Sequence, residues 1–76
     1  MTSYDEAYKK ARVLKSNIDN CIEYEKGFVF GASEDELYIG GNHIPVVILK
    51  QTGDAVTMPY FVANGTGKEI REFSIL

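Results

Sequence analysis

The most constraining feature of the sequence is a continuous apolar run, Val46-Val47-Ile48-Leu49, that follows Pro45. The run is rich in β-branched residues, and an unbroken apolar run suits a central strand that is covered on both faces. The next residues, Gln51-Thr52-Gly53-Asp54, have the composition of a tight turn in which Gly53 is free to adopt positive φ. We therefore expect the segment from Ala55 to Val62 to fold back antiparallel as a hairpin.

An amphipathic helix is expected near the N-terminus. Ser3 and Glu6 have the spacing of a capping box, in which their side chains bond the free backbone N–H groups at a helix start. Apolar residues then recur at steps of three and four, and so share one face of a helix: Tyr4, Ala7, Tyr8, Ala11, Leu14 and Ile18. We expect this helix to end near Asn20.

The residues after this helix favour strands. From Ile22 to Phe30 the apolar residues recur with a period of two, which predicts one half-buried strand. Residues 33–36 read as a polar turn, and 37–39 as a short second strand ended by Gly40-Gly41-Asn42. Ser33 and Glu36 could equally cap one helical turn.

The C-terminal third contains two further signals. Pro59 lacks an N–H donor, so we expect it at a bulge or on the side of its strand that forms no hydrogen bonds to a neighbouring strand. Thr66 and Glu69 repeat the capping-box spacing ahead of Ile70 and Phe73. This spacing favours a short C-terminal helical turn over a strand.

The length allows one hydrophobic core, so we expect a single domain over residues 1–76. Its expected class is α+β, with one N-terminal helix packed on a small antiparallel sheet of three to four strands. A lone cysteine, Cys21, cannot form an internal disulfide, and we expect the N-terminal residues to be neither a signal peptide nor a membrane anchor. These features predict a soluble cytoplasmic protein that has no contact with membranes.

The charge pattern bears on partners. A net charge of -3 argues against non-specific nucleic-acid binding, which needs clustered Lys and Arg. Acids dominate the stretch from Asp19 to Glu36, which could face a basic protein. Exposed tyrosines are good interface anchors. The candidate partner-binding residues are Glu34, Asp35, Glu36, Tyr38 and Tyr60, although the acids could equally form a solvated loop and each tyrosine could lie in the core.

The chain lacks a recognisable reaction centre. Gly65-Thr66-Gly67-Lys68 resembles part of a phosphate-binding loop, but Val62 and Glu69 stand where a glycine and a Ser or Thr are required. His43 has no evident nucleophile or companion ligand, and Cys21 has acidic neighbours that would raise its pKa. We expect Cys21 to be a buried or half-buried structural residue, and we expect no catalytic residue, metal ligand or cofactor.

The segment from Asn42 to Val56 resembles the YrhB-like immunity family of bacterial polymorphic-toxin systems. It shares an apolar strand that opens near a proline, a Thr-Gly turn and a second strand. The leading helix, the aromatic strand at residues 27–30 and the closing Gly-Thr stretch also follow the family order. The resemblance implies a non-enzymatic protein that neutralises a cognate toxin by occluding its active site or a neighbouring surface.

Two alternatives remain beside this immunity-type binder. One is an interaction module that self-associates through an exposed sheet edge, as a homo-oligomer. The other, a small enzyme, is the least favoured because no nucleophile, base and orienting group can be assembled from these residues.

Overall fold

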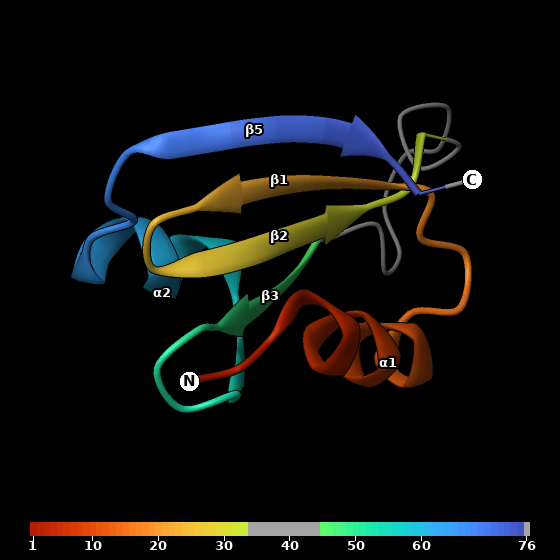
Figure 1. Ribbon diagram of the computed structural model, residues 1–76, viewed down its shortest axis with the longest axis horizontal. Helices are drawn as coiled ribbons and strands as arrows, with labels where there is room; N and C mark the ends of the chain where they lie inside the picture. Colours follow the sequence, from red (N-terminus) through yellow and green to blue (C-terminus); the bar gives the residue numbers. More distant parts are fainter. Residues whose placement is uncertain (34–44, 76) are drawn as a thin grey trace.

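The computed structural model describes residues 1–33 and 45–75, and within them the chain forms a five-stranded sheet with two α-helices (Figure 1). The elements are α1 (Tyr4–Leu14), β1 (Asn20–Tyr24), β2 (Gly27–Gly31), β3 (Val46–Leu49), β4 (Ala55–Val56), α2 (Met58–Asn64) and β5 (Glu69–Ser74). Every neighbouring pair of strands is antiparallel, in the order β4-β3-β2-β1-β5. The predicted α+β class is confirmed, with more strands than the three to four expected.

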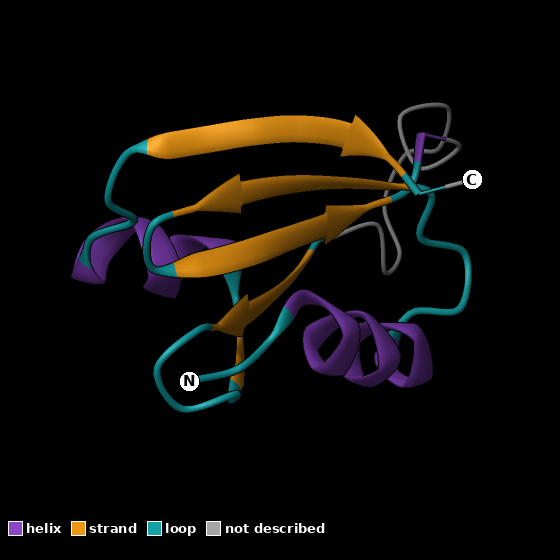
Figure 2. Ribbon diagram, viewed as in Figure 1, coloured by secondary structure: helices purple, strands orange, loops and turns teal. Residues whose placement is uncertain are grey.

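Both faces of the central strands are covered, and the two helices lie apart along the sheet (Figure 2). On one face, Ala7 and Ala11 of α1 pack against Phe30 and Ile48. On the other, Phe61 of α2 packs against Val29 and Val47. Val47 and Ile48 are neighbours in β3 that face opposite ways and are both fully buried. The prediction of a strand covered on both faces is therefore confirmed.

Helix α1 begins where the capping box predicts. The Ser3 hydroxyl accepts a hydrogen bond from the Glu6 N–H at 3.2 Å and donates one to the Glu6 carboxylate at 3.1 Å. The helix ends at Leu14, because Lys15 has an extended backbone, so the expected end near Asn20 is wrong. Leu14 is consequently half-exposed, whereas Ile18 reaches the core from the connection that follows the helix.

The predicted single strand from Ile22 to Phe30 is in fact a hairpin. Strands β1 and β2 pair across a turn at Glu25 and Lys26, with Ile22 opposite Val29. Even-numbered residues of β1 therefore pair with odd-numbered residues of β2, and paired residues share a face. Hence Ile22 lies on the α2 face while Phe28 lies on the α1 face, although their spacing in the sequence is even.

The predicted turn at Gly53 is confirmed, but the strand after it is short. Gly53 has a φ of 78°, and β4 contains only Ala55 and Val56. Thr57 then caps α2 by accepting a hydrogen bond from the Tyr60 N–H at 3.3 Å. Pro59 lies in the first turn of this helix, where a missing N–H costs nothing. The expected strand to Val62, with Pro59 at a bulge, is therefore wrong.

The expected C-terminal helical turn is also wrong, because residues 69–74 form the edge strand β5. The Thr66 hydroxyl does not cap a helix and donates instead to the Gly67 carbonyl at 2.8 Å. The Lys68 N–H donates to the Glu25 carboxylate at 2.6 Å, which fixes the entry into β5. Pairing with β1 gives β5 the backbone hydrogen bonds that the helical turn would have supplied.

The predicted turn at 33–36 and strand at 37–39 fall almost wholly outside the described residues. Within the described ranges, no helix has the length and apolar character needed to cross a membrane.

Candidate functional site

A groove opens at one end of the sheet, where the β1–β2 turn, the β3–β4 turn and α2 meet. Its volume is about 430 Å³, which lies within the usual range of ligand-binding pockets. The residues that line it are Met1, Glu25, Lys26, Leu49, Lys50, Gln51, Thr52, Tyr60, Phe61, Asn64 and Gly65. Apolar groups thus adjoin a polar border, as in many protein-binding surfaces.

Helix α2 supplies the aromatic part of the groove. Phe61 is only 1% exposed and contacts the Tyr24 ring edge-on, with ring centroids 5.6 Å apart. Tyr60 is 51% exposed, because successive helical residues point about 100° apart and Phe61 takes the inward direction. The Thr57 carbonyl also accepts a hydrogen bond from the Phe61 N–H at 3.0 Å. Together with the side-chain cap, this bond fixes the rotation of the helix that turns Phe61 inward and Tyr60 outward. The groove therefore combines a buried aromatic side chain with an exposed one.

Backbone hydrogen bonds hold the border of the groove in place. The Lys26 N–H donates to the Thr66 carbonyl at 3.1 Å, and the Lys50 N–H donates to the Lys26 carbonyl at 3.0 Å. The Thr2 N–H donates to the Lys50 carbonyl at 2.7 Å and so ties the N-terminal segment to the same corner. The side chains of Lys26 and Gln51 project from this fixed backbone and are exposed.

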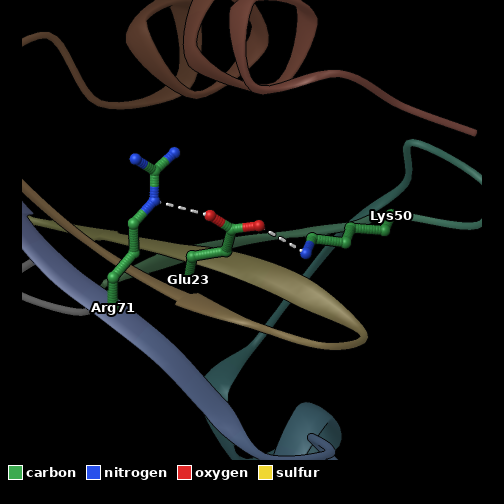
Figure 3. A network of polar contacts seen from close by, with 3 residues as sticks. All are labelled: Glu23, Lys50 and Arg71. Carbon is green, nitrogen blue, oxygen red and sulfur yellow. Dashed lines mark hydrogen bonds and ion pairs between the residues drawn. The ribbon is translucent and has the colours of Figure 1, made fainter.

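A charged network lies on the α1 face of the sheet (Figure 3), opposite the face that carries α2, and shares Lys50 with the groove lining. The Glu23 carboxylate accepts from the Lys50 ammonium at 2.7 Å through one oxygen and from the Arg71 Nε at 2.8 Å through the other. The hydrogen bond from Lys50, assisted by that from Arg71, outweighs burial and lowers the pKa of Glu23. The Lys50 ammonium also lies 4.9 Å from the centroid of the Phe28 ring. Glu23 is thus an ionised carboxylate that joins β1, β5 and the end of β3.

Of the sequence-predicted site residues, the structure describes Tyr60, which lines the groove. The other four, Glu34, Asp35, Glu36 and Tyr38, lie outside the described residues, as does His43.

The described acids of the stretch from Asp19 to Glu36 are bonded within the molecule. Asp19 accepts from the Ser33 N–H and hydroxyl, Glu23 from its two cations, and Glu25 from the Lys68 N–H. A carboxylate that is hydrogen-bonded internally offers less to a basic partner. In the described residues, therefore, this stretch stabilises the fold more than it forms a free acidic surface.

Cys21 is fully buried, as expected. Burial, with the Glu23 charge as a smaller cause, raises the pKa of its thiol to about 12. A thiol with such a pKa is a poor nucleophile at neutral pH. Within the described ranges, no three His, Cys, Asp or Glu side chains gather closely enough to hold a metal ion.

Sequence reasoning did not anticipate the groove, because it assigned Tyr60 and Phe61 to a strand. A local signal was available: Thr57 stands ahead of Pro59, and Gly65 follows the segment, which is the pattern of a capped helix. No local signal in the sequence indicates that Lys26 and Lys50 line the groove, because these residues are brought together only by the pairing of strands in the sheet.

No family model matches the chain, and no curated protein and no solved structure matches it either.

Proposed function

We propose that this chain is a non-enzymatic protein-binding domain whose groove receives an apolar side chain of a partner protein. The observation that carries the proposal is the half-exposed Tyr60 beside the buried Phe61 in a groove with a fixed border. A tyrosine offers a large, stiff contact area with a polar tip, and such residues dominate binding energies at protein interfaces.

The groove is suited to a protein partner in two further respects. Its backbone border is hydrogen-bonded on both turns, so less conformational freedom is lost when a partner binds. Met1 is 97% exposed at one side, and the flexible methionine side chain adapts to different apolar groups.

The proposed partner is a bacterial toxin, which the domain would neutralise as an immunity protein. This step rests on the resemblance of residues 42–56 to the YrhB-like immunity family. Occlusion of a toxin requires a stable surface and no chemistry, which agrees with the inert thiol of Cys21. The acids Glu34, Asp35 and Glu36 are proposed as a contact with a basic partner; their reversal to lysine should then weaken toxin binding and change its salt dependence.

The test is affinity capture from the native cell with matched bait proteins. We expect the unmodified chain to capture a protein that is toxic when expressed alone, and a Tyr60→Lys bait to lose it. Val62→Lys is the control, because Val62 is 61% exposed on the same helix but does not line the groove. Equal capture by the Tyr60→Lys and Val62→Lys baits would exclude the groove as the binding surface. A captured protein without toxicity would exclude the immunity role.

Self-association through a sheet edge is the second candidate. Strand β5 favours it, since its six residues form an edge of the described sheet. However, β5 contains a register irregularity opposite Glu23 and Tyr24 and carries Glu69, Arg71 and Glu72, all features that blunt an edge. Strand β4, at the other edge, has only two residues. We therefore expect sedimentation to give the mass of a monomer.

A further inference from the structure

We infer that Arg71 forms a second contact point for the partner, at which its guanidinium binds the carboxylate of an acidic side chain on that protein. The inference rests on the proposed protein-binding function and adds to it the chemistry of one partner residue. It stands on the geometry of Arg71, on the charge of its surroundings and on the position of Lys50.

Arg71 is held in place while its binding edge remains open. The Nε donates to Glu23 at 2.8 Å, and the guanidinium carbon lies 4.6 Å from the centroid of the Phe73 ring. The two terminal nitrogens point away from Glu23 (Figure 3), and they have no partner among the described residues. The side chain is 58% exposed. These terminal nitrogens form the planar fork that matches a carboxylate in a bidentate pair.

The charge of the network favours an anion. Glu23 contributes one negative charge against the two positive charges of Lys50 and Arg71, so one positive charge is left over. Lys50 is largely buried, with 12% of its side chain exposed, and its ammonium is committed to Glu23. The uncompensated charge is therefore presented to solvent at Arg71.

The position of the network favours an acidic side chain of the same protein that occupies the groove. Glu23 and Arg71 lie on the α1 face, whereas Leu49 and Phe61 of the groove lie on the α2 face. Lys50, which follows β3, belongs to both the groove lining and the network, so the two sites meet only around this end of the sheet. A carboxylate brought by that partner meets a guanidinium that is already oriented, which reduces the ordering cost of the contact. The partner would thus reach around this end of the sheet, with an apolar side chain in the groove on the α2 face and an acidic one at Arg71 on the α1 face.

A first test uses acetate as the probe and Arg12 as the internal control. Arg12 is also exposed, but it lies on α1 and donates to the Tyr8 hydroxyl at 2.8 Å. In ¹⁵N-labelled protein, acetate should shift the Arg71 side-chain resonances saturably and several-fold more than those of Arg12. Chloride at equal ionic strength should not. Equal, non-saturating shifts at both arginines would overturn the inference.

A second test uses the captured partner. We expect Arg71→Ala to weaken its binding about tenfold, with less loss at high salt, and Arg71→Lys to lose most of the same affinity because a lysine has no fork. Circular dichroism would establish that each variant is folded; if Arg71→Ala is not, Arg71→Lys decides. Full affinity in Arg71→Lys and Arg71→Ala, together with loss in Tyr60→Lys, would refute the Arg71 contact and leave the groove standing. Full affinity in all three would refute both proposals.

Discussion

The Glu23 network should divide its stabilising energy unequally between its two cations. Lys50 and Glu23 have only 12% and 16% of their side chains exposed, whereas Arg71 has 58% exposed. Water and salt screen an ion pair in proportion to its exposure. We therefore predict that the pair of Glu23 with Lys50 couples more strongly than the pair of Glu23 with Arg71, although their bond lengths differ by little.

The magnitudes follow from these exposures. A hydrogen bond between charged groups away from solvent contributes about 1.5–3 kcal/mol, and we place the coupling of Glu23 with Lys50 near the lower end, at about 1.5 kcal/mol. Exposed pairs contribute about 0.2–1 kcal/mol, so the coupling of Glu23 with Arg71 should be about 0.5 kcal/mol. Glu23→Gln removes the negative charge that compensates the Lys50 ammonium, which lies over the Phe28 ring. We expect that variant to lose about 2 kcal/mol.

The assay is a pair of double-mutant cycles measured by urea unfolding. One combines Glu23→Gln with Lys50→Met, which keeps the length and packing of the lysine stem. The other combines Glu23→Gln with Arg71→Met. Each cycle gives the coupling energy as the part of the double-mutant effect that the two single mutants do not explain. For a domain of this size, the loss in Glu23→Gln should also lower the melting temperature by roughly 10 °C.

Two results would refute the reasoning. Equal coupling energies in the two cycles would mean that exposure does not govern this network. A larger coupling energy for Arg71 than for Lys50 would mean that Glu23 stabilises the edge strand β5 more than it stabilises the end of β3.

Three further predictions concern the fold. Phe61→Ala should destabilise the protein by about 3–5 kcal/mol, measured by urea unfolding, since its side chain is 1% exposed between α2 and the sheet; a loss below half of that would contradict the packing. Gly53→Ala should cost about 1–2 kcal/mol in the same assay, because Gly53 has a φ of 78° and its new methyl would lie 2.9 Å from the Thr2 hydroxyl. The pKa of Glu23 is lower in the folded than in the unfolded state, so its stabilisation is present at neutral pH and is lost as the pH falls below 4.5; the pH dependence of unfolding should show this loss, and Glu23→Gln should remove it.

The outcome at α2 and β5 shows where local signals succeed and where they mislead. Around Thr57 and Pro59 the sequence contains a local helix-start signal that agrees with the structure. Thr66 and Glu69 have an equally good capping-box spacing, yet Glu69 begins a strand. The difference is that β1 offers β5 a complete set of backbone partners. A helix cap contributes about 1 kcal/mol, which does not outweigh the backbone hydrogen bonds that β5 forms with β1.

The candidate site was predictable only at Tyr60. Sequence reasoning chose this residue as an interface anchor, and the structure places it in the groove. The rest of the site depends on long-range neighbours: Glu23 is 27 residues from Lys50 and 48 from Arg71 along the chain. No periodicity or spacing in the sequence relates residues so far apart, because their contact follows from strand order.

The sequence by itself determined the features that depend only on a few neighbouring residues. The helix start at Ser3, the doubly covered strand at 46–49 and the turn at Gly53 depend on a cap, on β-branched residues and on positive φ, and each acts over a few residues. Only the tertiary structure decided that residues 22–30 fold as a hairpin and that residues 69–74 join its outer strand. These choices depend on which distant surfaces are buried together. The groove on the α2 face and the Glu23 network on the α1 face exist because that burial brought distant residues together on each face of the sheet.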